Sequence, residues 1–148
     1  MAAFVETSES SACRIELSGI LQGSNPEDVY LSFIDPDRIR RWWADESEVE
    51  PVVDGRLIVR WPSMGWTMRG RYTELVPSRL LGFTWSWDHE PDTPTRTVSV
   101  RIDADAAGAR LTLTHGEYGA EDIEERKSHL EGWQHFLPRL AAVLSSAS

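Results

Sequence analysis

The sequence contains a single cysteine, Cys13, and no long run of apolar residues. One cysteine cannot form an internal disulfide, which fits a reducing compartment. No segment approaches the ~18 consecutive apolar residues that a membrane-spanning helix needs. The first residues, "MAAFVETSESSA", have neither the basic start nor the apolar stretch of a secretory signal. We therefore expect a cytoplasmic protein with no membrane partner and a flexible N-terminus, residues 1–11.

Basic residues are scarce relative to acidic ones. The 15 Lys and Arg residues stand against 24 Asp and Glu residues, which gives a formal net charge of -9 and a pI near 4.9. This charge opposes nonspecific attraction to phosphate backbones and to anionic lipid surfaces. The composition therefore predicts no nucleic-acid partner.

Motifs for metal, cofactor or covalent chemistry are absent from the sequence. The histidines His89, His115, His129 and His135 show neither an i, i+4 pair nor the HExxH spacing of zinc sites. No GxSxG motif marks a serine nucleophile, and Cys13 is better explained as a small core residue of the first strand than as an activated thiolate. Neither a GxGxxG motif nor a P-loop is present to hold nucleotide phosphates. We predict no metal, no cofactor and no covalent catalysis.

What the chain does contain is the pattern of one mixed α and β domain. A length of 148 residues suits a single domain. Residues 13–21 alternate apolar and polar side chains, as a half-buried strand does. Two short helices are predicted next, over 26–34 and 36–43. Ser24 or Asn25 caps the first and Asp35 the second, and each helix starts with a proline.

Residues 48–115 predict an antiparallel meander, and residues 119–146 predict a long helix. The strand segments alternate in polarity and are separated by turn signals such as Asp54-Gly55. The last segment places Leu130, Trp133 and Leu137 at helical spacing. The strands expected in this region are 47–53, 55–61, 66–75, 79–87, 96–103 and 109–115.

The seven tryptophans are the unusual component of the composition. In "LLGFTWSW", residues 80–87, a period of two places Leu81, Phe83, Trp85 and Trp87 on one face and smaller residues on the other. A sheet with many indoles on its inner face cannot lie tightly against a helix that also presents Trp133 unless the two layers are held apart. We therefore expect a cavity between sheet and helix, or else an unusually thick core.

These segments, taken in order, resemble one superfamily. The strings "VYLSFIDPDRIRRWWA", "DGRLIVRW", "MRGRYTELVPSRLLGFTWSW", "ARLTLTH" and "HLEGWQHFLPRL" are similar to the START-like (SRPBCC) superfamily, and within it to the branch named for the activator of heat-shock protein 90 ATPase. The resemblance covers roughly residues 12–145 and implies a START-like domain over 12–148. It implies an α+β helix-grip fold, in which a curved antiparallel sheet of about six or seven strands wraps around a long C-terminal helix. Two short helices follow the first strand.

The resemblance also implies a site between the sheet and the C-terminal helix, where members of the superfamily bind lipids, hormones or polyketides. We predict non-catalytic binding of an apolar, aromatic-containing small molecule in such a cavity. Aromatic residues are equally common in ordinary cores, so packing explains each candidate as well as ligand binding does. The candidate ligand-binding residues are Trp42, Trp61, Trp66, Met68, Tyr72, Phe83, Trp85, His115, Trp133 and Phe136.

Two alternative functions follow from the same resemblance. The heat-shock branch includes co-chaperone domains that bind the chaperone and stimulate its ATPase, which connects the chain with the stress response. Other superfamily members are polyketide cyclases or dehydratases, and such an enzyme needs an acid–base pair. His115 with Tyr72 or Tyr118 is the only plausible pair, although a structural role is more common for a lone histidine. We expect a monomer or a homodimer.

Overall fold

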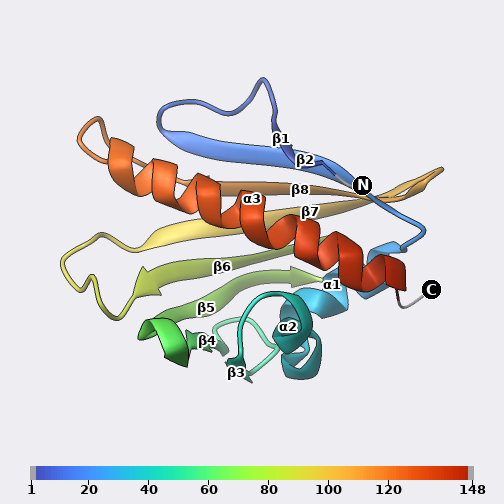
Figure 1. Ribbon diagram of the computed structural model, residues 1–148, viewed down its shortest axis with the longest axis horizontal. Helices are drawn as coiled ribbons and strands as arrows, with labels where there is room; N and C mark the ends of the chain where they lie inside the picture. The colour runs from blue at the N-terminus through green and yellow to red at the C-terminus, as the bar shows by residue number, and fades with distance from the viewer. Residues whose placement is uncertain (1–2, 147–148) are drawn as a thin grey trace.

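The structure, a computed structural model, describes residues 3–146 and contains one eight-stranded antiparallel sheet and a long C-terminal helix (Figure 1). The strands lie in the order β1-β2-β8-β7-β6-β5-β4-β3. The elements are β1 (Val5–Glu6), β2 (Arg14–Gln22), α1 (Pro26–Ile34), α2 (Pro36–Trp42), β3 (Glu46–Val49), β4 (Arg56–Trp61), the 3-10 turn η1 (Pro62–Met64), β5 (Trp66–Val76), β6 (Leu80–Trp87), β7 (Arg96–Asp105), β8 (Gly108–Gly116) and α3 (Ile123–Ser146).

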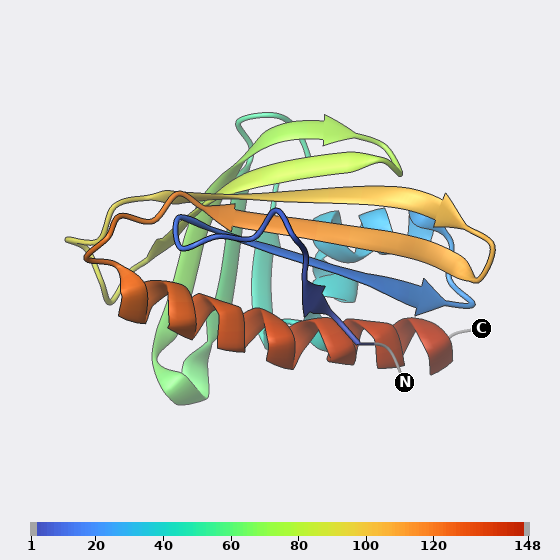
Figure 2. The same cartoon turned by 90° about the horizontal axis from the view of Figure 1, so that it is seen from above.

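The sheet curves around α3, and the two short helices lie on the same side of it (Figure 2). Helix α3 packs on β2 and α2, and α1 packs on β7 and β8. This arrangement confirms the α+β helix-grip fold with two short helices after the first long strand. The sheet has eight strands rather than six or seven because the short strand β1 pairs with β2, with Val5 opposite Ser18.

The two short helices form where they are expected because each has a capping side chain and a proline at its start. The side chain of Asn25 accepts a hydrogen bond from the amide of Asp28 at 2.9 Å, and that of Asp35 accepts one from the amide of Asp37 at 2.9 Å. Asp35 also ends α1, so the chain turns at this residue between the helices. The turn brings the C-terminus of α2, with Trp43 as its cap, onto the concave face.

Alternate strand residues face α3 and form the core. In β6, Leu81, Phe83 and Trp85 are buried, as the period of two predicts. Helix α3 contributes Leu137 and Leu140, which are fully buried. Each such side chain contributes about 1.5–3 kcal/mol when it leaves water, so the apolar stripe of α3 holds the helix in the curve of the sheet.

Two buried hydrogen bonds attach the short helices to this core. The hydroxyl of Tyr72, on β5, donates to the carbonyl of Phe33 at 2.7 Å, and the indole N–H of Trp42 donates to the carbonyl of Ser32 at 2.9 Å. Both acceptors lie near the C-terminus of α1, where the last carbonyls of a helix have no partner within the helix. The inner face of the sheet is therefore closed at the end that α1 and α2 cover.

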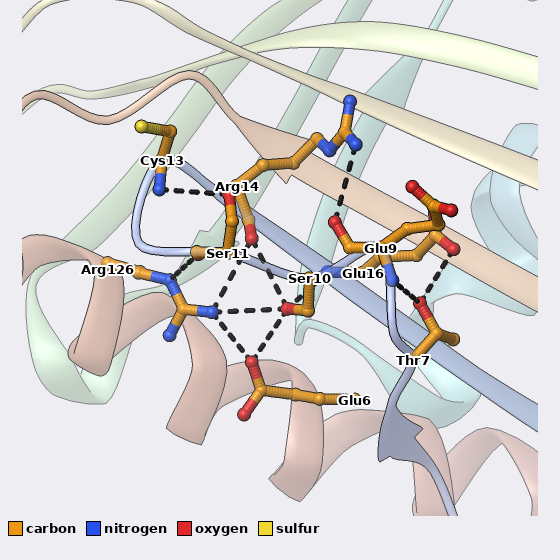
Figure 3. Close-up of polar contacts among 9 residues, drawn as sticks. All are labelled: Glu6, Thr7, Glu9, Ser10, Ser11, Cys13, Arg14, Glu16 and Arg126. Carbon is orange, nitrogen blue, oxygen red and sulfur yellow. Dashed lines mark hydrogen bonds and ion pairs between the residues drawn. The ribbon is translucent and has the colours of Figure 1, made fainter.

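The N-terminal segment contacts the start of α3 (Figure 3). The guanidinium of Arg126 donates to the carboxylate of Glu6 at 2.6 Å and to the carbonyl of Ser11 at 2.8 Å. Phe4 is buried, and a Cβ on Gly19 would lie 2.7 Å from its ring. Residues 3–11 of the predicted flexible N-terminus thus have contacts with the domain. Residues 1 and 2 lie outside the described residues, as do residues 147 and 148 of the predicted domain 12–148.

Cys13 is exposed, so its expected place in the core was wrong. Strand β2 begins at Arg14, and Cys13 lies in the tight turn that the Ser11–Arg14 bridge closes. A turn residue before the first paired position does not follow the inside–outside alternation of the strand.

Within residues 3–146, no helix is long and apolar enough to cross a membrane. Helix α3 has the necessary length but carries charged residues, such as Glu124 and Glu125 in its first turn.

Candidate functional site

A groove of about 1010 Å³ opens at one end of the concave face. It lies between the end of α2, the ends of β4 and β6, and the first half of α3. Its wall is built from side chains within residues 40–45, 61–66, 85–93, 121–125 and 128–139. The groove therefore lies beside the packed core, at the end that α1 and α2 leave open.

Aromatic side chains form most of the apolar wall of the groove, with Trp43 at their centre. The ring centroid of Trp43 lies 5.6 Å from that of Trp133 and 6.3 Å from that of Trp85. Tilted and offset rings at such separations attract one another, so the wall is a packed cluster. Its members are Trp43, Trp61, Trp66, Trp85, Trp87, Trp133 and Phe136.

The ten candidate ligand-binding residues divide equally between the groove wall and the core. Those on the groove wall are Trp61, Trp66, Trp85, Trp133 and Phe136. Those in the core, each less than 2% exposed, are Trp42, Met68, Tyr72, Phe83 and His115. Periodicity places the strand residues on the inner face, but it does not indicate which part of that face the short helices cover.

The expected site did not include most of the wall residues, among them Trp43, Trp87 and His129. His129 could have been predicted from the sequence, because it precedes Trp133 by four residues and therefore lies on the same face of the helix. For the neighbouring indoles of Trp42 and Trp43, only the tertiary structure distinguishes the one in the core from the one in the groove.

His129, on the groove wall, belongs to a buried hydrogen-bonded pair that differs from the pairs expected for His115. The hydroxyl of Tyr118 lies 2.7 Å from Nδ1 of His129, whereas Tyr72 bonds a backbone carbonyl. His115 accepts a hydrogen bond at Nδ1 from the indole of Trp133 at 3.0 Å, and its ring stacks on that of His129 with centroids 4.5 Å apart. Of these two stacked histidines, only His129 lines the groove.

Burial keeps this cluster uncharged near neutral pH. Loss of hydration lowers the pKa of His129 to about 4. Burial, with the nearby His129 and Arg96, lowers the pKa of His115 well below its ordinary value. Burial raises the pKa of the Tyr118 hydroxyl, and the nearby Glu125 adds to this effect. At neutral pH the cluster therefore presents hydrogen-bond donors and acceptors without charge.

Two buried N–H groups of the cluster have no hydrogen-bond partner within residues 3–146: Nε1 of Trp85 and Nε2 of His115. Since Nδ1 of His115 accepts from Trp133, the proton of the neutral ring lies on Nε2. A buried donor without an acceptor costs about 1–3 kcal/mol. Both atoms have almost no accessible surface, although Trp85 itself lines the groove with other parts of its ring.

Arg96, on β7, holds the start of α3 against the sheet beside the groove. Its guanidinium donates to both carboxylate oxygens of Glu125, at 2.9 and 2.6 Å, and lies 3.1 Å from the carboxylate of Asp122. Bidentate pairs of this kind fix orientation as well as distance. The position of the first turn of α3, and with it one side of the groove mouth, is therefore set by a part-buried ion pair.

Residues 3–146 contain no cluster of three or more His, Cys, Asp or Glu side chains that could hold a metal ion.

The sequence of residues 24–145 matches the protein family described as activator of Hsp90 ATPase homolog 1-like protein. No curated protein matches the chain.

Several solved structures share the fold. The chain superposes on protein MLL2253 from Mesorhizobium loti with a TM-score of 0.81 and 16% identity, over 91% of this chain and 98% of that one. The crystal structure of CalU16 from Micromonospora echinospora gives a TM-score of 0.68 and 21% identity, over 95% and 80% of the two chains. DynU16, a protein in the dynemicin biosynthetic locus, gives a TM-score of 0.73 and 20% identity, over 92% of this chain and 48% of that one. At these identities the likeness extends to the fold alone.

Proposed function

Because this chain belongs to the family of activator of Hsp90 ATPase homolog 1-like proteins, we propose that it binds an apolar, aromatic-containing small molecule in the groove between the sheet and α3. The observation that carries the proposal is a wall of six indoles and one phenyl ring around about 1010 Å³ of open space. Ligand sites are usually concave and mostly apolar, with a few polar groups that orient the ligand. His129, whose Nδ1 is hydrogen-bonded to Tyr118, is a polar group of that kind on the groove wall.

Gly132 leaves room on the helix side of the groove. It lies within α3 and lines the groove, and no heavy atom lies within 4 Å of the position that its Cβ would occupy. Glycine inside a helix costs about 0.5–1 kcal/mol relative to alanine, and no neighbouring atom here requires it. The space in front of residue 132 is therefore available to a ligand, and a larger side chain there offers a way to block binding.

The variant Gly132→Phe tests the proposal. A panel of hydrophobic aromatic compounds should include members that raise the melting temperature of the wild-type protein and change its tryptophan fluorescence. Gly132→Phe should lose this response because its ring occupies the groove. Gln134→Phe is the matched control, since it adds the same ring to an exposed position of α3 outside the groove. A wild-type protein that responds to no compound, or a Gly132→Phe variant that responds as the wild type does, contradicts the proposal.

Catalysis of the polyketide cyclase or dehydratase kind is a second candidate function. One contact favours it: the 2.7 Å hydrogen bond between Tyr118 and Nδ1 of His129. This bond orients the His129 ring and leaves its Nε2 without a partner among residues 3–146, where it can donate or accept a proton according to the tautomer. Because the pKa of His129 is lowered to about 4, the ring is neutral at pH 7. Its Nε2 is then a weak base in the tautomer with the proton on Nδ1, and a hydrogen-bond donor in the other tautomer.

Linear poly-β-keto N-acetylcysteamine thioesters, incubated with the protein and followed by mass spectrometry, test this second function. Cyclised or dehydrated products should form faster than without protein. Tyr118→Phe should slow the reaction while binding persists, because it removes only the hydroxyl that orients His129. A rate equal to that of the protein-free solution rules out this chemistry on these substrates.

Co-chaperone activity is supported only by the description of the family, which names activation of the Hsp90 ATPase. Titrating the protein into Hsp90 while measuring ATP hydrolysis tests it directly. A flat titration removes this function and leaves the groove proposal intact.

A further inference from the structure

The charged side chains around the groove are mostly acidic. Seven of the lining residues are Asp or Glu, and two are Arg. A cleft lined by charges of one sign concentrates ions of the opposite sign. The net charge of -9 for the whole chain acts in the same direction.

Four of these carboxylates have no ion-pair partner among residues 3–146: Asp45, Glu121, Glu124 and Glu131. By contrast, Arg96 neutralises part of the charge of Asp122 and Glu125, and Glu90 lies 4.0 Å from the ring of His89. Of the two arginines, Arg40 is paired with Asp37, outside the groove. The potential at the groove mouth is therefore negative.

The aromatic wall below these carboxylates also favours cations. The face of an indole ring carries partial negative charge, and cations within about 6 Å of the ring centroid are attracted to it. One such contact exists within the groove, where the guanidinium of Arg139 lies 5.8 Å from the centroid of the Phe136 ring. A bound cation thus meets ring faces at the wall and carboxylates at the rim.

The groove therefore favours an occupant that combines a flat apolar body with a positive charge, because such a molecule contacts both the ring faces and the carboxylates.

We propose that the groove selects organic cations, in particular ammonium compounds with an aromatic body, over neutral and anionic molecules of the same shape. This inference rests on the proposed small-molecule binding and adds the charge of the ligand. Carboxylates at the rim attract the cation during approach, and the indoles replace part of its hydration in the bound state. An anion of similar size is repelled by the carboxylates at the rim and by the partial negative charge on the ring faces.

Three matched probes separate charge from shape: (2-naphthylmethyl)trimethylammonium, its uncharged carbon isostere 2-neopentylnaphthalene, and the anion 2-naphthylacetate. Calorimetric titration of the wild-type protein should give an affinity for the ammonium compound about tenfold higher than for the isostere. Binding of the anion should be weaker still. Raising NaCl from 20 to 300 mM should weaken binding of the ammonium compound alone, because salt screens the rim charges.

A triple variant assigns the selectivity to the rim. Glu121→Gln, Glu124→Gln and Glu131→Gln together should lower the affinity for the ammonium compound several-fold and leave that for the isostere unchanged. The control triple Glu9→Gln, Glu27→Gln and Glu74→Gln changes the net charge equally, at exposed positions away from the groove, and should have little effect.

The outcomes separate this inference from the proposal on which it rests. If the isostere binds as tightly as the ammonium compound, or if the groove triple does not weaken cation binding, the charge preference is wrong and small-molecule binding stands. If none of the three probes binds, the charge preference is wrong, and the response to the compound panel decides whether small-molecule binding stands.

Discussion

The indole N–H groups on the groove wall are of two kinds, which a pair of substitutions can distinguish. Trp133 donates to Nδ1 of His115, whereas Trp85 has no acceptor. Trp133→Phe leaves Nδ1 of the fully buried His115 without a donor, but Trp85→Phe removes an unsatisfied donor. We expect Trp133→Phe to lose about 1–3 kcal/mol more free energy of unfolding than Trp85→Phe, measured by urea denaturation. Equal losses in the two variants would show that ring volume alone matters at both positions.

The neutral ring of His129 makes stability depend on pH. Its pKa is lowered to about 4 in the folded state and lies near 6.5 in the unfolded chain. Between these values the unfolded chain binds more protons, so the free energy of unfolding falls as the pH drops from about 6.5 towards 4. The loss is on the order of 3 kcal/mol, since each pKa unit is worth about 1.4 kcal/mol. Buried His115, whose pKa is lowered too, contributes in the same direction.

Melting temperatures measured between pH 7 and pH 4.5 test this prediction. His129→Gln should show a smaller decrease than the wild-type protein, because Gln retains polarity but does not titrate. His135→Gln, at an exposed position on the same helix, should follow the wild-type curve. Parallel curves for all three proteins would contradict the role given to His129.

Among the elements, the contact between α3 and the N-terminal segment depends on one side chain. Arg126 bonds to Glu6 and to the carbonyl of Ser11, and it lies 3.2 Å from the hydroxyl of Ser10 (Figure 3). Arg126→Gln should raise amide hydrogen exchange in residues 5–11 while the core strands keep their protection, because local contacts open separately from the core. The cost in global stability should be about 1 kcal/mol or less. Lys127→Gln, an exposed neighbour, is the control and should leave the exchange unchanged.

The elements themselves could be predicted from the sequence because their signals are local. The alternation in residues 80–87 depends only on neighbours along the chain, and so do the caps at Asn25 and Asp35. The short strand β1 was not predicted, because a strand of two residues is too short to show an alternation of apolar and polar side chains. Its pairing depends on long-range contacts, such as that of Phe4 over Gly19.

The candidate site was predictable only in part, because it depends on where elements meet. Trp61, Trp85 and Trp133 come together as expected from their faces. The partner of Tyr118 is His129, from the next helix, and not His115 from its own strand end. Sequence patterns assign residues to a face, but the packing of α2 and α3 decides which part of the face remains open.

At the scale of the whole molecule, one concave face serves both stability and the proposed binding. The end covered by α1 and α2 is closed, with Tyr72 and Phe83 fully buried. The other end carries the same kind of aromatic surface but borders the groove, where Trp87 is half-buried and Trp66 is 38% exposed. The aromatic side chains on the concave face therefore extend beyond the packed core and into the groove.

The excess of negative charge should make the folded protein more stable in salt. Folding brings the 24 acidic and 15 basic residues closer together, and the resulting self-repulsion opposes the compact state. Raising NaCl from 50 to 500 mM shortens the Debye length from about 14 to about 4 Å, so the melting temperature should rise by a few degrees, equivalent to about 1 kcal/mol. The triple variant of Glu121, Glu124 and Glu131 to Gln should show a smaller rise, since it removes unpaired carboxylates that lie close together on α3 and on the segment that precedes it. A melting temperature that falls with salt would mean that the surface ion pairs, not the net charge, dominate the electrostatics of the fold.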